Sequence, residues 1–163
     1  MKSIFVIISI AFLTFTANAQ SGQYAGNYKK WIKKEVVKAK EAVFFKGFIH
    51  TGFMLLQSDD EIEYFLQQYK KGSTHIILLI SHIKDALSYT IEDVLEIKQM
   101  AAKDNIQSGN CTWQGSHNAK VIVLENNTNH KPKNTKAWYA DTDKLRFVSI
   151  STKGINCIIE GAD

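Results

Sequence analysis

The sequence predicts an α+β fold in which N-terminal helices pack on a C-terminal antiparallel β-meander within a single domain. Two observations lead to this prediction. Before Gly109, apolar residues recur at three- and four-residue intervals, which is the spacing of one helix face. After Gly109, short β-rich runs alternate with turn residues. Helical segments followed by strands are typical of α+β domains, whose helices cover one face of the sheet.

Residues 1–19 are expected to form a signal peptide. Lys2 supplies a positive charge, residues 4–15 an apolar centre, and residues 17–19 a small-x-small cleavage site. The apolar centre is too short for a stable membrane anchor, and later apolar runs are shorter still, so we expect no transmembrane segment after signal removal. The mature chain, residues 20–163, is therefore expected to be secreted or periplasmic and to form one domain.

Residues 24–43 are expected to form the first helix. Their apolar side chains share one stripe, and six lysines between Lys29 and Lys40 make the remaining surface basic. Such a helix can bind an anionic membrane or a cell-wall polymer, although a solvated polar face on a packed helix is the commoner meaning. Residues 44–57 also fit helical spacing, and we expect a helix there, but two glycines and high β-propensity leave a strand open.

The next segment carries the strongest helical pattern. Ser58 followed by Glu61 resembles a capping box, in which the two side chains bind the free N–H groups of the first turn. Apolar residues from Ile62 to Tyr69 share one face, and Gly72 follows where a helix is expected to end.

Two more segments precede Gly109. Residues 74–87 match helical spacing, yet the unbroken apolar run 76–80 fits a buried strand equally well, so periodicity does not decide between them. Thr90 with Asp93 predicts the start of another helix, whose apolar residues continue to Ala102.

The C-terminal third is expected to contain the sheet. Its four β-rich runs are 121–124, 137–139, 145–150 and 155–159. The two cysteines, Cys111 and Cys157, flank this region, and disulfides persist outside the cytosol, so we expect them to be joined. A redox role is disfavoured because a Cys-x-x-Cys pair is absent.

The best candidate for a binding surface combines aromatic and basic side chains in the C-terminal part. It consists of Trp113, Lys131, Lys133, Trp138 and Tyr139. Aromatic groups beside cations can stack on sugars or bases, attract anions and anchor a protein partner. Core packing of at least one tryptophan is the plainer expectation. Signal removal lowers the formal net charge from +4 to +3. Such a small positive charge, in an exported chain, disfavours nucleic-acid binding.

The sequence contains little that indicates a catalytic or metal-binding site. His117 and His130 flank the run 121–124 with several carboxylates nearby, and a His–carboxylate pair in a cleft can act as general acid and base. His75 and His82 are expected at the edge of the core, and no role is expected for His50. No serine-nucleophile elbow, phosphate loop or metal-ligand spacing occurs, and we expect no cofactor.

Asp141 and Asp143 resemble the opening of a calcium loop. The glycine and the downstream glutamate of such a loop are absent at the required positions, so an Asx-type hairpin turn is the better interpretation.

Three classes of function remain open. The first, which the absence of motifs favours, is an exported binding protein, such as an inhibitor or a toxin-neutralising partner, with a protein or cell-envelope partner. The second is a cell-envelope hydrolase whose His–carboxylate site leaves no sequence signature. The third is an envelope-associated structural module that docks through the lysine-rich N-terminal segment.

Overall fold

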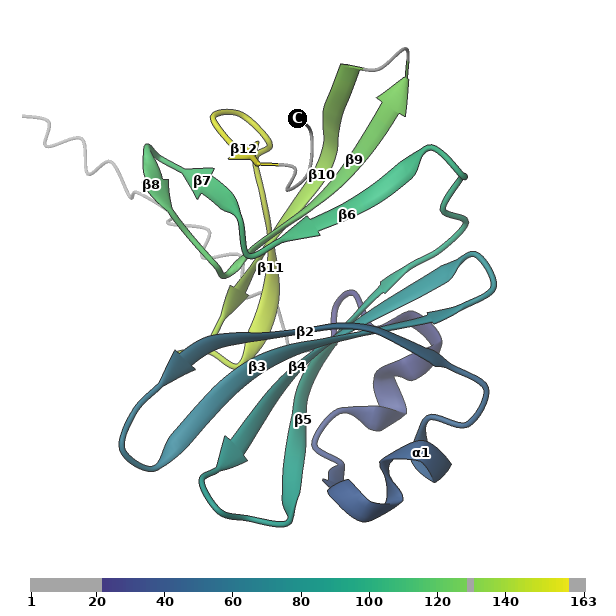
Figure 1. Ribbon diagram of the computed structural model, residues 1–163, viewed down its shortest axis with the longest axis vertical. Coiled ribbons are helices and arrows are strands. Elements are labelled where there is room, and N and C mark those ends of the chain that lie inside the picture. Colours follow the sequence, from purple (N-terminus) through teal and green to yellow (C-terminus); the bar gives the residue numbers. More distant parts are fainter. Residues whose placement is uncertain (1–21, 129–130, 159–163) are drawn as a thin grey trace, which may run out of the picture.

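The computed structural model describes residues 22–128 and 131–158, and these form a mostly β structure (Figure 1). Strands account for 58% of the described residues and build three antiparallel sheets. The only α-helix among these residues is α1 (Glu41–Phe44), which follows two 3-10 segments, η1 (Gly26–Trp31) and η2 (Lys38–Lys40). The predicted α+β fold with N-terminal helices is therefore wrong. The predicted signal peptide lies outside the described residues.

The large sheet occupies the region in which the sequence predicts helices. Its strands are β1 (Glu35–Val37), β2 (Ile49–Ser58), β3 (Ile62–Lys71), β4 (Thr74–Ile83) and β5 (Ser88–Ile97), in the spatial order β1-β5-β4-β3-β2. Strands β2 to β5 form an antiparallel meander of long hairpins, and β1 closes the far edge against β5. The predicted helices at 58–71 and 90–102, and the helix expected at 44–57, are thus replaced mainly by strands, and 24–43 contains only short helical segments and β1. The segment 74–87, which the sequence leaves undecided, contains the strand β4.

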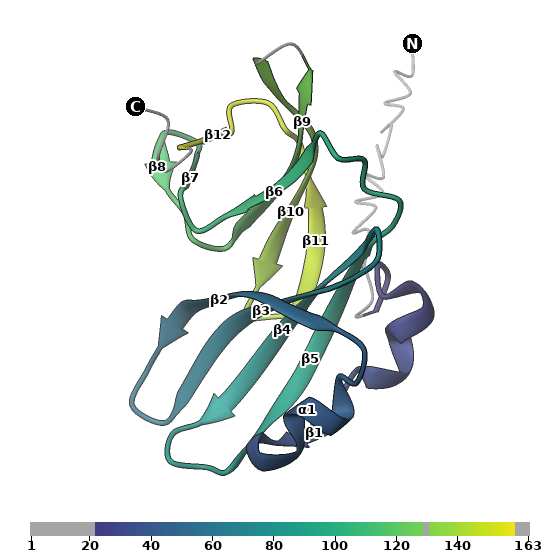
Figure 2. The same ribbon diagram turned by 45° about the vertical axis from the view of Figure 1, so that its right-hand side comes forward.

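Burial of β4 on both faces explains why this strand resembles a helix in sequence. Ile76 and Leu78 of β4 face the N-terminal segment, residues 22–48, whereas Ile77 and Leu79 face the second sheet. Figure 2 shows these two layers on opposite sides of the large sheet. A strand covered on both faces has no polar face to give period-two alternation, so its apolar run is continuous.

The capping-box pattern after Ser58 belongs to the turn between β2 and β3. The Asp59 carboxylate accepts hydrogen bonds from the backbone N–H groups of Glu61, at 3.0 Å, and Ile62, at 2.7 Å. These bonds lower the pKa of Asp59. An aspartate that binds the N–H groups two and three residues ahead is common to helix starts and to Asx turns, which is why the pattern is ambiguous.

Asp93, which the sequence predicts at the start of the last helix, instead makes contacts between layers. It lies at an irregularity in the β4–β5 register and is 1% exposed. Its carboxylate accepts backbone hydrogen bonds from Val94 at 2.8 Å, from Gly22 at 2.7 Å and from Phe147 at 2.8 Å. One side chain therefore joins the large sheet to the N-terminal segment and to the second sheet.

The second sheet has the order β11-β10-β9-β6 and packs on the large sheet. Its strands are β6 (Asp104–Ser108), β9 (Val121–Thr128), β10 (Lys131–Asp141) and β11 (Arg146–Ile150). Three of the predicted C-terminal strands therefore exist, within β9, β10 and β11. The last predicted strand, 155–159, is reduced to a two-residue strand and runs beyond the described residues at its end.

The small sheet has the order β12-β7-β8 and contains the disulfide. Its strands are β7 (Cys111–Trp113), β8 (Ser116–His117) and β12 (Asn156–Cys157). Cys111 and Cys157 are bonded across paired strands, so the predicted disulfide is confirmed. Over residues 22–128 and 131–158, no helix is long and apolar enough to cross a membrane.

Candidate functional site

The structure does not bring the five residues of the predicted binding surface together. Trp138 and Tyr139 are neighbours in β10, so they point to opposite faces of the second sheet. Trp138 is 7% exposed and belongs to the core between the large and second sheets. Tyr139 packs beside Trp113 on the other face, with ring centroids 5.5 Å apart. Lys133 is exposed near the start of the same strand, which begins at Lys131.

Of the two histidines near the predicted surface, only His117 lies within the part of the chain that the structure describes. The Nε2 atom of His117 lies 2.8 Å from the carbonyl oxygen of Gly109, and His117 has no carboxylate partner among the described residues. His130 lies outside the described residues. Asp141 accepts a hydrogen bond from the backbone N–H of Lys144 at 3.0 Å, as in an Asx turn. No group of three possible metal ligands occurs within the described part of the chain.

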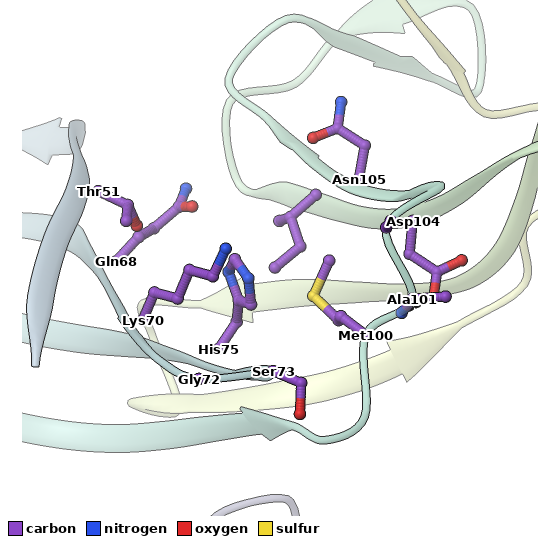
Figure 3. A pocket seen from close by; sticks show the side chains of 12 residues that line it. Thr51, Gln68, Lys70, Gly72, Ser73, His75, Met100, Ala101, Asp104 and Asn105 are labelled. Atoms are coloured by element: carbon purple, nitrogen blue, oxygen red, sulfur yellow. Dashed lines mark hydrogen bonds between the residues drawn. The ribbon is translucent and has the colours of Figure 1, made fainter.

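Two concave regions lie instead on opposite faces of the large sheet. The first, named here the cavity, has a volume of about 590 Å³ and lies between the β3–β4 hairpin and β6 (Figure 3). Lys70 and His75, which are paired across β3 and β4, point into it. The second, named here the cleft, has a volume of about 350 Å³ and lies on the face that carries the N-terminal segment.

The cleft combines aromatic walls with a polar floor. It is lined by Lys38, Glu41, Phe53, Glu63, Phe65, Gln67, Ile80, His82 and Tyr89. A neighbouring hollow of about 520 Å³ shares Lys38 and Glu41 with it and continues along α1 to Phe48 and His50. Together they follow the part of the sheet that the N-terminal segment leaves uncovered. Five of these nine lining residues are charged or polar, and the other four supply apolar or aromatic surface.

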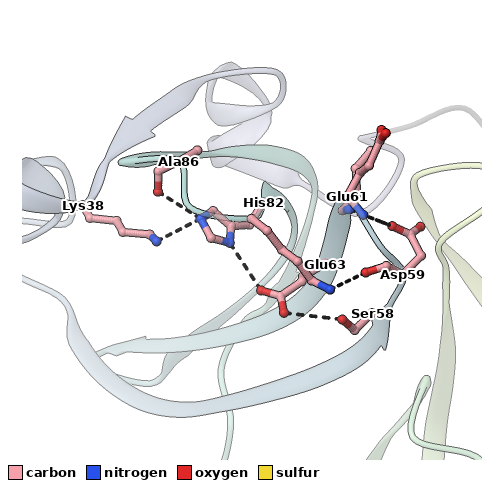
Figure 4. Close-up of polar contacts among 9 residues, drawn as sticks. Lys38, Ser58, Asp59, Glu61, Glu63, His82 and Ala86 are labelled. Carbon is pink, nitrogen blue, oxygen red and sulfur yellow. Dashed lines mark hydrogen bonds and ion pairs between the residues drawn. The ribbon is translucent and has the colours of Figure 1, made fainter.

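His82 lies at one end of the cleft and is held on both ring nitrogens (Figure 4). Its Nδ1 atom is 3.4 Å from a Glu63 carboxylate oxygen, and its Nε2 atom is 2.9 Å from the Lys38 ammonium. The same Nε2 atom also lies 3.1 Å from the carbonyl oxygen of Ala86. The Lys38 contact ties the N-terminal segment to β4.

Neighbouring polar groups engage both ring nitrogens of His82. Nε2 contacts the Lys38 ammonium and the Ala86 carbonyl oxygen, and Nδ1 faces the Glu63 carboxylate. None of the described residues that line the cleft is a serine, threonine or cysteine. The Ser58 hydroxyl lies nearby and contacts the Glu63 carboxylate at 3.4 Å.

Tyr89 and Glu41 of the cleft, with Tyr69 of the neighbouring hollow, form a second polar group. The Tyr69 hydroxyl donates to the Glu41 carboxylate at 2.5 Å, which fixes α1 over β3. The Tyr89 side chain is 4% exposed, and its hydroxyl makes no hydrogen bond of normal geometry with any described residue. Burial, together with the negative charge of Glu41, raises the pKa of both tyrosines, so both hydroxyls stay protonated. The buried Tyr89 hydroxyl therefore lies in the polar group that Tyr69 and Glu41 form.

The mouth of the cleft runs into the edge strand β2. Phe53 is 56% exposed and Leu55 is 47% exposed. Phe53 lines the cleft and packs on Phe65, with ring centroids 4.7 Å apart, and Leu55 is paired with Phe65 across the strands. The two exposed side chains thus extend the apolar wall of the cleft to the edge of the sheet.

The His82–Glu63 contact was missed because residues 58–71 were interpreted as a helix and residues 74–87 were left undecided between a helix and a strand. If both are strands, the tight turn at Gly72 and Ser73 sets their register and places Glu63 opposite His82. The signal was present in the turn residues and in the β-branched composition of 76–80.

No protein-family model, curated protein or solved structure matches this chain.

Proposed function

We propose that the mature chain is an exported, non-catalytic protein that binds an extended apolar segment of a partner protein. The segment lies along the free edge of β2 and places apolar side chains against the mouth of the cleft. The observation that carries this proposal is the continuity of an unpaired strand edge with an apolar cleft, since Phe53 belongs to both.

The free edge of β2 defines the kind of partner. Among the described residues β2 pairs only with β3, so alternate N–H and C=O groups along its outer side lack a strand partner. An extended peptide that adds to such an edge gains backbone hydrogen bonds, and every second side chain faces one side of the sheet. On β2 that side is the one with Phe53 and Leu55.

The composition of β2 leaves this edge open to pairing. Edge strands are commonly protected by charged side chains, and β2 contains no lysine, arginine, aspartate or glutamate. Its protection is limited to two irregularities in register, between His50 and Gly52 and between Leu55 and Gln57. The regular stretch from Gly52 to Leu55 lies between them, so a short strand of about four residues fits best.

The charges at the two ends of β2 orient the bound segment. Asp59, Asp60 and Glu61 lie in the turn at one end of β2, whereas Lys70 and Lys71 lie at the opposite end of β3. Lys84 partly balances the acidic turn through a hydrogen bond to the Asp59 carbonyl. A peptide with a basic residue near the turn and an acidic residue near the lysines is therefore favoured in one direction.

The disulfide supports the exported location in this proposal. Cys111 and Cys157 are bonded, and such bonds persist in oxidising compartments such as the periplasm or the extracellular space. The predicted signal peptide at residues 1–19 points the same way.

A display library of random twelve-residue peptides, selected on the immobilised mature protein, tests the proposal. Selected peptides should contain alternating apolar residues, and Phe53→Lys should weaken their binding at least tenfold. Ile158→Lys is the matched control, because Ile158 is also an exposed apolar residue, 68% exposed, but lies beside β12. Circular dichroism of both variants checks that the fold is retained.

A second measurement tests the strand-pairing itself. Two versions of a selected peptide are compared, one methylated on the backbone nitrogens of its odd positions and one on those of its even positions. One version should lose binding and the other should keep it, because only every second N–H faces β2. Equal effects in both versions, or peptides without alternation, would contradict the proposal. Dimerisation through β2 in sedimentation experiments, lost in Phe53→Lys, would replace the foreign partner with a second copy of the chain.

A further inference from the structure

The cavity on the other face of the large sheet has a composition that suits a different ligand. It is lined by Thr51, Gln68, Lys70, Gly72, Ser73, His75, Met100, Ala101, Ala102, Asp104, Asn105 and Ile106. Its volume of about 590 Å³ is in the range of small-molecule sites. One wall is apolar, because Met100 and Ile106 pack at the border of the core between the large and second sheets. The opposite wall carries Lys70 and His75 (Figure 3).

The charges that face the cavity come from three strands. Lys70 on β3 and His75 on β4 form one side, and Asp104 on β6 lies at the other. The Asp104 carboxylate is already engaged, because it accepts hydrogen bonds from the Ala101 N–H at 2.8 Å and from the Asn126 amide at 2.7 Å. Lys70 makes no ion pair with any described residue.

His75 adds a polar donor beside this lysine. Burial, and then the nearby Lys70 charge, lower the pKa of His75, so its imidazole is neutral at pH 7. A neutral imidazole still donates one N–H, and an anion beside it favours its protonated form. The cavity therefore presents one permanent positive charge and one donor that gains charge when an anion binds.

We propose that this cavity binds a small monocarboxylate with an apolar tail. The carboxylate lies between Lys70 and His75, and the tail lies against Met100 and Ile106. A single cation matches a single negative charge, whereas a dianionic phosphate would lack a second cation and would face Asp104. The site is separate from the cleft, since the two lie on opposite faces of the large sheet.

Hexanoate is the probe that tests this inference, with the His75 ring proton signals followed by NMR. Hexanoate should shift these signals, raise the pKa of His75 and bind more tightly as the pH falls toward 6. Lys70→Gln should weaken binding at least tenfold. Lys71→Gln is the matched control, because the Lys71 ammonium lies over the Phe48 ring on the opposite face, 5.2 Å from its centroid.

Chain length and one further variant test the apolar wall. Acetate should bind more weakly than hexanoate, by up to about fourfold for each methylene that hexanoate buries. Met100→Gln should weaken hexanoate binding and leave acetate binding unchanged. The inference is overturned if His75 does not respond to millimolar hexanoate, or if Lys70→Gln and Lys71→Gln have equal effects. Phosphate binding as tight as hexanoate binding would also overturn it.

Discussion

At the scale of single residues, Asp93 shows how a buried charge can hold layers together. Three backbone N–H groups from three layers donate to its carboxylate, with donor–acceptor distances of 2.7–2.8 Å. Such charge-assisted bonds offset the cost of removing a carboxylate from water, and they also fix the relative positions of Gly22, Val94 and Phe147.

Asp93→Asn is therefore expected to lower the free energy of unfolding by about 2–4 kcal/mol. The amide keeps one acceptor oxygen but turns an NH₂ group toward a backbone donor, so at least one N–H loses its partner. Urea denaturation of the variant measures the loss. Asp60→Asn, at an exposed position in the β2–β3 turn, is the control and should change stability by less than about 0.5 kcal/mol. A loss at Asp93 no larger than this control would show that the layers are held without it.

At the scale of elements, the large sheet explains what could be predicted from the sequence and what could not. The C-terminal strands were predictable because turn residues bound each of them, as at Asp141, which accepts from the Lys144 N–H. The N-terminal strands were not, because β3 and β4 are covered on both faces and their apolar residues fall by chance at helical spacing. The candidate cleft is lined by residues of these strands, so the cleft could not be predicted from the sequence either.

The central position of β4 leads to a prediction about its dynamics. β4 is paired on both sides, and its residues Ile76 to Leu79 are fully buried. Its opening requires the loss of both neighbouring layers, so its amides should exchange with solvent only through global unfolding. Hydrogen exchange followed by NMR or mass spectrometry should find the slowest amides of the described residues in β4. Amides of the edge strand β2 should exchange orders of magnitude faster, and comparable rates in the two strands would contradict the arrangement.

At the scale of the whole molecule, the layers form a sequence from the N-terminal segment through the large and second sheets to the small sheet. An apolar cluster lies at each of the three contacts between successive layers, and the outermost contains Cys111, Val121, Val123, Ala137 and Ile155. The large sheet is covered on both faces, whereas the small sheet has only two- and three-residue strands. The disulfide thus lies where secondary structure contributes least to stability.

Loss of the disulfide should therefore lower the stability of the molecule, and the small sheet should open first. The bond joins residues 46 positions apart, and opening a loop of this size releases unfolded-state entropy worth about 4 kcal/mol. The double variant Cys111→Ala/Cys157→Ala should lower the free energy of unfolding by about 2–5 kcal/mol. Its amides in β7 and β12 should lose protection from exchange first, while those of β4 stay the slowest. Peptide mapping without reduction, on protein from its native compartment, should recover the linked cysteine pair. Two free thiols in that sample would contradict both the Cys111–Cys157 disulfide and the exported location proposed for the chain.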